Sequence, residues 1–143
     1  MKSTPLVSID LIVLNSRNEV LLGLRTNAPA RDSWFVPGGR IYKNESIAAA
    51  FGRLCLEELG LDSRADCAEP LGLFEHLYPD SHFDDRISTH YVVAAFLLRL
   101  DPDTAGLPDS QHLHWRWWSL DAAQADKAVH PYTQDYLARL PRR

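Results

Sequence analysis

The chain has few cysteines and no long uncharged apolar run, and these deficits exclude several classes of protein. Cys55 and Cys67 are too few for a disulfide framework and lack metal-site spacing, so we expect reduced thiols, one of them in the core. No apolar run approaches the roughly 20 residues of a membrane span, and Met1–Leu6 lacks the apolar stretch of a secretory signal. We therefore expect a cytoplasmic protein with no membrane partner.

The size and composition indicate one folded domain. The 143 residues are 45% hydrophobic and 24% charged, which is ordinary for a globular protein, and the length is too short for two comfortable domains. We therefore treat residues 1–143 as a single domain with one core.

Charge is unevenly distributed along the chain. The net charge of −4 argues against binding to nucleic acid. Between Arg17 and Arg53, however, six basic residues, five of them arginines, outweigh three acidic ones. Because a guanidinium group binds phosphate oxygens in pairs, this segment suits a small phosphorylated ligand, although a solvated face rich in arginine would look the same.

Apolar periodicity predicts a mixture of strands and helices. Strands are expected at residues 6–14, 20–24, 71–78, 89–100 and 113–120, and helices at residues 45–59, 121–127 and 132–140. The first two strands form a hairpin, Asn44 caps the first helix, and Gly60 ends it. Pro37-Gly38-Gly39 predicts a sharp turn with a close backbone approach. The order of elements predicts an α/β (α+β) sandwich in which helices cover a mixed sheet.

Two carboxylates fall where apolar side chains are expected. On a regular helix, Glu58 lies in the middle of the apolar face, near a C-terminus whose dipole disfavours an anion. A divalent cation or an arginine would then have to meet it, unless the last turn frays and Glu58 reaches water. Asp10 lies inside an apolar strand, where alternation favours a solvent-exposed side chain over a buried, paired one.

The first helix and the segment before it resemble the Nudix box. Gly39, Glu45 and Arg53 precede the run Leu54-Cys55-Leu56-Glu57-Glu58-Leu59-Gly60-Leu61, so the box spans residues 39–61. The resemblance implies a Nudix-like α/β/α fold. Arg53 and Glu57 stand one turn apart, either as an exposed ion pair or as residues that support a metal-binding carboxylate from behind. The box usually has a glutamate directly after the arginine, and Leu54 at this position removes one carboxylate from a shared metal cluster.

That departure and the sequence around it resemble the GDP-mannose mannosyl hydrolases. The resemblance covers nearly the whole chain and rests on Ser3–Ser8, Thr26-Asn27, Trp34–Arg40, Ala49–Phe51, Thr89–Val93 and Gln111-His112. Members of that family have the Nudix fold but cleave at the sugar carbon, giving GDP and mannose with inversion. The resemblance therefore implies an enzyme that hydrolyses GDP-mannose or GDP-glucose.

The same resemblance implies the residues of a metal site. The backbone carbonyl of Gly38, the carboxylate of Glu58 and the side chain of Gln111 would hold one Mg²⁺, with Mn²⁺ as an alternative. Hard oxygen ligands and a diphosphate favour these ions over an imidazole site formed by His112 and His114.

The resemblance also implies the residues that act on the substrate. His112 would activate water as a general base, although a loop histidine by itself is more often a surface residue. Arg25 would contact the diphosphate and stabilise the leaving group, and Arg40 would support the substrate. Asp10 and Tyr91 would lie near the sugar or the phosphates, although Tyr91 could equally pack in the sheet.

The other histidines and the tryptophans receive structural interpretations. We interpret His76 and His90 as structural residues. Trp115, Trp117 and Trp118 are expected to be core and platform aromatics.

Two other functions remain open. A conventional Nudix pyrophosphohydrolase would attack phosphorus, and the feature against it is Leu54. A non-catalytic nucleotide-sugar binding module would show no turnover, and the presence of Glu58, Gln111 and His112 argues against it. The family resemblance further implies a homodimer, although relatives carry an extra segment where this sequence has only two residues before Ser3.

Overall fold

The computed structural model describes residues 4–25, 32–79, 89–100 and 113–140. Its strands are β1 (Leu6–Leu14), β2 (Glu19–Arg25), β3 (Trp34–Phe35), β4 (Gly38–Arg40), β5 (Glu69–Tyr78), β6 (Thr89–Arg99) and β7 (Leu113–Ser119). Its helices are α1 (Ile47–Leu54), α2 (Leu120–Ala125) and α3 (Pro131–Ala138), with short helical turns at Cys55–Leu59 and Ala65–Cys67. Every strand and helix expected from the sequence is present.

Within the described residues, seven strands form one mixed sheet with β1 in the interior. β1 runs parallel to β6, and β5 pairs antiparallel with the other side of β6. On its remaining side, β1 pairs with β2 next to the hairpin turn, at Leu14 and Val20, and farther along with β4, where Asp10 faces Gly38. β2 therefore diverges from β1 after the predicted hairpin, and β4 takes its place.

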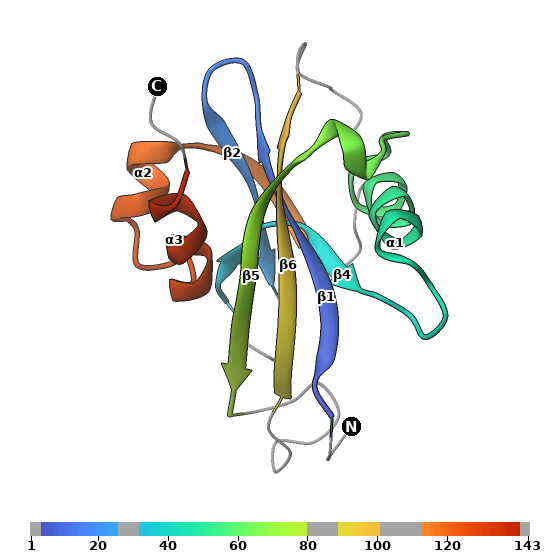
Figure 1. Ribbon diagram of the computed structural model, residues 1–143. Coiled ribbons are helices and arrows are strands. Elements are labelled where there is room, and N and C mark those ends of the chain that lie inside the picture. Colours follow the sequence, from blue (N-terminus) through green and yellow to red (C-terminus); the bar gives the residue numbers. More distant parts are fainter. Residues whose placement is uncertain (1–3, 26–31, 80–88, 101–112, 141–143) are drawn as a thin grey trace.

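Helices cover both faces of this sheet, which gives the molecule three layers (Figure 1). α1 lies on one face, whereas α2 and α3 lie on the other. Each face has its own apolar cluster: Ile9 and Leu11 of β1 pack in the cluster of α1, and Ile12 and Leu14 pack in that of α2 and α3. None of the helices in the described ranges is long and apolar enough to cross a membrane. The arrangement confirms the expected α/β/α sandwich.

The cysteines and tryptophans largely follow their predictions. Both cysteines are free, with Cys55 buried and Cys67 exposed. Trp118 is in the core, and Trp115 and Trp117 are partly buried against the α1 cluster.

The first helix differs from its prediction at both ends. Ser46 rather than Asn44 caps it, because the Ser46 hydroxyl accepts a hydrogen bond from the backbone N–H of Ala49 at 3.0 Å. Asn44 has a φ of 69° and belongs to the preceding turn. At the other end, the helix widens into a π-helical turn over Cys55–Leu59, which Gly60 closes with a φ of 66°. A projection based on a regular α-helix therefore misplaces the side chains of this last turn.

The two glycines after Pro37 form a strand rather than the expected sharp turn. Gly38 and Gly39 belong to β4 and pair with Asp10 and Ile9 of β1. The predicted close backbone approach is confirmed, because a Cβ atom on Gly38 would overlap the Asp10 side chain and the carbonyl oxygen of Ile9. The absence of a side chain at position 38 therefore lets β4 lie directly against β1.

Candidate active site

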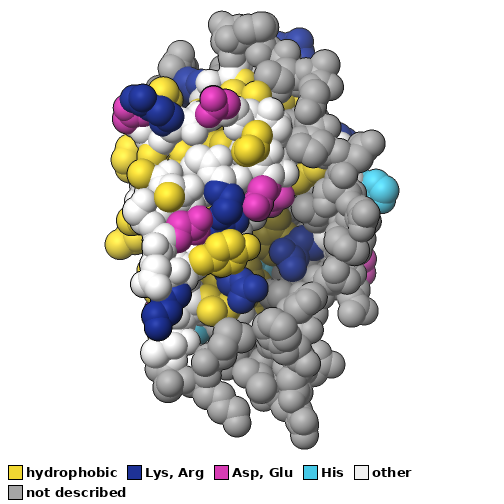
Figure 2. Space-filling view, turned by 90° about the vertical axis from the view of Figure 1, so that its right-hand side faces the viewer, with side chains coloured by type: hydrophobic (Ala, Val, Ile, Leu, Met, Phe, Trp, Pro, Cys, Tyr) yellow, Lys and Arg dark blue, Asp and Glu magenta, His cyan; other side chains and the backbone are white. Residues whose placement is uncertain are grey.

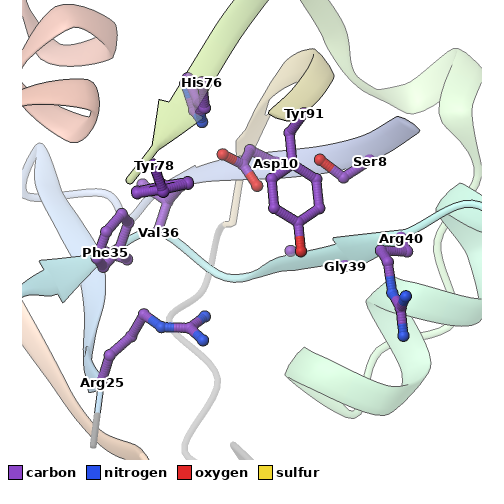
Figure 3. A pocket seen from close by; sticks show the side chains of 11 residues that line it. Ser8, Asp10, Arg25, Phe35, Val36, Gly39, Arg40, His76, Tyr78 and Tyr91 are labelled. Atoms are coloured by element: carbon purple, nitrogen blue, oxygen red, sulfur yellow. The ribbon is translucent and has the colours of Figure 1, made fainter. Parts of the chain in front are cut away.

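A hollow of about 610 Å³, open to solvent, lies where β2 diverges from β1. Figure 2 looks onto the α1 side of the molecule, where basic and acidic side chains gather. The side chains and backbone that line the hollow come from six strands, β1 to β6, and their ends: Ser8, Asp10, Arg25, Phe35, Val36, Gly38, Gly39, Arg40, His76, Tyr78 and Tyr91. Four of these, Asp10, Arg25, Arg40 and Tyr91, are residues for which the sequence predicts substrate contact, and the structure brings them together (Figure 3).

Arg25 presents its guanidinium group to the hollow without a direct ion pair among the described residues. It lies at the end of β2, with its guanidinium 5.9 Å from the Phe35 ring centroid. Its Nε atom is buried without a hydrogen-bond partner, and no carboxylate in the described part of the chain lies within ion-pair distance of it. Since a buried donor without a partner is costly, an anionic or polar ligand would satisfy it.

Asp10 is half-buried and paired, so the favoured prediction of an exposed side chain is wrong. β1 lies inside a sheet covered on both faces, and alternation along such a strand exposes neither set of side chains. The Tyr136 hydroxyl donates a hydrogen bond to Asp10 Oδ2 at 2.7 Å. Burial raises the pKa of Asp10 to about 6, against the lowering effects of this hydrogen bond and of Arg25. Asp10 therefore titrates close to neutral pH.

Glu58 lies at the back of the same region, beside β4. Its side chain is half-buried, and the turn that carries it stays helical up to Gly60, so the last turn does not fray. Burial raises the pKa of Glu58, and the neighbouring Glu57 adds to this effect. A hydrogen bond from the Gly38 backbone and the positive charge of Arg25 act in the opposite direction. Arg25 therefore supplies some of the positive charge that was expected near Glu58. Gly38 and Glu58, both predicted metal ligands, lie next to each other.

Leu54 occupies the place where the Nudix box usually has a glutamate. Its side chain is 3% exposed, and a Cβ atom built on Gly39 would lie 2.5 Å from Leu54 Cδ2. Position 54 therefore points at the glycine strand that borders the hollow. An apolar side chain there leaves Glu58 without a second carboxylate from the same face of α1.

Arg53 ties the parts of the Nudix box together. Its guanidinium donates two hydrogen bonds to Glu45, at 2.8 and 2.9 Å, and one to Glu57 at 3.1 Å. A fourth goes to the carbonyl oxygen of Arg40 at 2.8 Å, and the guanidinium lies 4.1 Å from the centroid of the Tyr42 ring. The two bonds to Glu45, together with one from the Tyr42 backbone N–H, lower the pKa of Glu45 to about 2. Arg53 thus forms the expected pair with Glu57 and also fixes β4 to the helix.

The donor atoms near Glu58 suit a single hard divalent cation. The half-buried Glu58 carboxylate supplies oxygens, which Mg²⁺ prefers, and the Gly38 peptide lies beside it. No group of three histidine, cysteine, aspartate or glutamate side chains that could hold a metal occurs in the described ranges. A cation would therefore need neutral oxygens, water or substrate to complete its coordination. Two predicted contributors, Gln111 and His112, lie outside the described residues, and the competing ligand His114 is exposed.

Sequence reasoning missed several residues of the site. His76, interpreted as structural, is buried and lines the hollow. His90 is not among the lining residues, and its Nε2 atom lies 2.9 Å from Glu75 Oε2. Alternation along β5 could have indicated this, because it places His76 and Tyr78 on one face. Tyr136 could not have been found in this way, because it is 126 residues from Asp10 in the chain.

The fold, the box and the hollow define a domain of the Nudix class, and comparison with known proteins agrees. The NUDIX domain family model matches residues 4–140, so the chain belongs to the Nudix family. The chain is 40% identical over 138 residues to the low-salt glycan biosynthesis protein Agl8 of Haloferax volcanii, covering 96% of this chain and 83% of that protein.

Solved structures share the fold at low sequence identity. A MutT NUDIX hydrolase from Burkholderia pseudomallei superposes with a TM-score of 0.77 and 21% identity, over 97% of this chain and 100% of that one. A MutT protein from Methanosarcina mazei Go1 gives a TM-score of 0.74 and 20% identity, over 96% and 94% of the two chains.

Proposed function

We propose that this protein is a Mg²⁺-dependent hydrolase of a GDP-sugar, GDP-mannose or GDP-glucose, that cleaves at the anomeric carbon. The products are GDP and the free sugar with inverted configuration. The observation that carries the proposal is Leu54, which is buried against Gly39 in place of a carboxylate, beside a hollow lined by Asp10, Arg25 and Arg40. The glycan-related name of the Haloferax relative supports a sugar-containing substrate.

The charge of the hollow suits departure of a nucleoside diphosphate. Arg25 and Arg40 both line it, and the Nε atom of Arg25 lacks a partner within the described structure. A diphosphate leaving group needs neutralisation of its growing negative charge rather than a proton. Attack at carbon therefore requires cations beside the diphosphate and a base on the opposite side of the sugar.

A metal ion would contribute to the same neutralisation. Glu58, the Gly38 carbonyl and Gln111 would hold Mg²⁺ or Mn²⁺, and the bound ion would supply positive charge to the diphosphate oxygens. His112 would take the proton of the attacking water, by the family resemblance. Arg53 and Glu57 would keep α1 and β4 in place behind these ligands.

Hydrolysis in ¹⁸O-labelled water tests the site of attack. Purified protein with Mg²⁺ and a panel of nucleotide sugars is followed at short times, before the free sugar exchanges its label. We expect unlabelled GDP together with labelled sugar, and NMR should show the inverted anomer before mutarotation. Label in GDP, or formation of GMP and sugar phosphate, would contradict attack at carbon and favour the conventional pyrophosphohydrolase.

Two variants test the assigned groups. Glu58→Gln should abolish Mg²⁺-dependent release of GDP, which would also exclude a non-catalytic binding module. Arg25→Ala should lower kcat by roughly 10²–10³, the usual loss for one preorganised electrostatic contact. The matched control is Arg116→Ala, because Arg116 stacks on Trp118 at 3.7 Å and does not line the hollow. A rise in KM alone for Arg25→Ala would limit Arg25 to binding.

A further inference from the structure

A hydrogen-bond chain enters the hollow from helix α3. Tyr136 Oη lies 2.7 Å from Asp10 Oδ2 and 3.1 Å from His76 Nε2, so one hydroxyl joins a strand of the sheet interior to β5. Both Asp10 and His76 line the hollow, whereas Tyr136 lies behind them and is 1% exposed. The carboxylate therefore has a buried partner on the side away from the ligand space.

The charge of Asp10 sets the direction of this chain. An ionised carboxylate only accepts hydrogen bonds, so the single Tyr136 proton points to Asp10. The Tyr136 oxygen then accepts from His76, which must carry its proton on Nε2. Burial lowers the pKa of His76 to about 4, so the ring is neutral and has one proton to donate.

Packing holds the Tyr136 hydroxyl in this position. The ring meets Phe74 edge-on, with centroids 4.7 Å apart and an interplanar angle of 89°. Leu137, the next residue of α3, is buried in the cluster on the same face of the sheet. Because the ring cannot turn away without opening the core, its hydroxyl is a fixed donor aimed at one oxygen of Asp10.

The other oxygen of Asp10 faces the ligand side. A Cβ atom on Gly38 would overlap Asp10 Oδ1, so Oδ1 lies against the glycine strand. In Figure 3 one carboxylate oxygen points toward His76 and the other toward β4 and Tyr91. The two oxygens thus have separate surroundings, one in the wall and one in the hollow.

We infer that Tyr136 is a positioning residue that orients Asp10 for contact with the substrate, through its hydrogen bond to Oδ2. The inference rests on the proposed function in one respect, that Asp10 contacts the nucleotide sugar. Tyr136 touches neither the substrate nor the hollow, and its effect passes through Asp10. Loss of the hydroxyl frees the Asp10 side chain to leave this χ1 rotamer, so Oδ1 meets the substrate in only part of the population.

The test replaces one oxygen atom. Tyr136→Phe keeps the ring and its contact with Phe74, and should lower kcat/KM for the nucleotide sugar roughly 10- to 100-fold. Tyr132→Phe is the matched control: it makes the same change in the same helix, but the Tyr132 hydroxyl bonds the backbone of Leu77 at 2.8 Å instead of Asp10. Tyr132→Phe should leave kcat/KM within about twofold of the wild type.

A double-mutant cycle with Asp10→Ala separates positioning from a general loss of structure. If Tyr136 acts through Asp10, adding Tyr136→Phe to Asp10→Ala should change kcat/KM by less than about twofold. Full additivity, or a single variant Tyr136→Phe as active as the wild type, would overturn the inference.

A measurement without turnover keeps the two proposals distinguishable. NMR couplings across the Asp10 side chain report its χ1 rotamers in the ligand-free protein. We expect one rotamer in the wild type and in Tyr132→Phe, and averaging between rotamers in Tyr136→Phe. An unchanged rotamer in Tyr136→Phe would overturn the positioning inference even if nucleotide-sugar hydrolysis is confirmed. Absence of hydrolysis by the wild type would refute the proposed function. The χ1 measurement would then still test whether Tyr136 positions Asp10.

Discussion

Asp10 shows how one residue can favour a site at the expense of stability. Its side chain is half-buried at the edge of the hollow, and desolvation outweighs Tyr136 and Arg25 in setting its pKa at about 6 instead of 3.8. An acid whose pKa is raised by folding binds protons more tightly in the folded state. The free energy of unfolding therefore falls as pH rises from about 4 to about 6, and the full penalty is present at pH 7.

Asp10→Asn should remove this penalty and keep an oxygen that accepts from Tyr136. At pH 7 we expect the variant to be more stable than the wild type by up to about 3 kcal/mol. The gain should shrink as pH falls from 6 to 4, where Asp10 in the wild type becomes protonated. Urea unfolding in the presence of EDTA at several pH values measures the difference in free energy of unfolding between the variant and the wild type. His76 titrates in both proteins, so its own pH dependence cancels when the two are compared at the same pH. A gain independent of pH would show that the charge of Asp10 is not its cause.

At the scale of elements, local sequence signals predicted which segments form strands and helices. They predicted the ends of the first helix less well. The Gly60 helix stop follows from local chemistry, whereas Asn44 and Ser46 are both good capping residues, and only the three-dimensional turn decides between them. The π-helical turn after Leu54 has no marker in the sequence that a regular projection would detect. For the site, family resemblance predicted Asp10, Arg25, Arg40 and Tyr91 among the residues that line the hollow, but not His76. Tyr136 was not predicted either, because its contact with Asp10 depends on how α3 packs.

The strand β4 gives a prediction of its own. Gly38→Ala places a methyl group onto Asp10 Oδ1 and the fixed Ile9 carbonyl oxygen, so we expect a loss of about 1–3 kcal/mol in stability and a marked loss of activity. Gly52→Ala is the control, because its added carbon would meet only the Ser63 carbonyl oxygen at 3.6 Å, an ordinary contact. Within α1 this control should be neutral or stabilising by up to about 1 kcal/mol. Chemical denaturation and steady-state kinetics of both variants measure the contrast, and similar losses in the two would contradict the role given to β4.

At the scale of the whole molecule, two apolar clusters share one sheet. Alternate residues of β1 belong to the α1 cluster and to the cluster of α2 and α3. If one helix layer leaves the sheet, β1 loses its packing on that face. Because the same strand also carries the other cluster, the packing of the second layer weakens too. We expect the described domain to unfold as one cooperative unit.

Leu59→Ala on one face and Leu137→Ala on the other test this cooperativity. Both leucines are buried, at 0% and 3% exposure, and each variant should lower the free energy of unfolding by about 2–5 kcal/mol. Far-UV circular dichroism and tryptophan fluorescence should report coincident transitions in both variants. Separate transitions for the two probes would show that the layers unfold independently.

The bond between Tyr136 and Asp10 also has a consequence for synthesis on the ribosome. The two residues stand 126 positions apart, so Asp10 emerges early and waits for its partner until nearly all of the described chain has been translated. A nascent chain that has already formed β1 and the Nudix box still carries an unrestrained carboxylate. Completion of the site therefore coincides with docking of α3, and a chain truncated before this helix lacks the donor that orients Asp10.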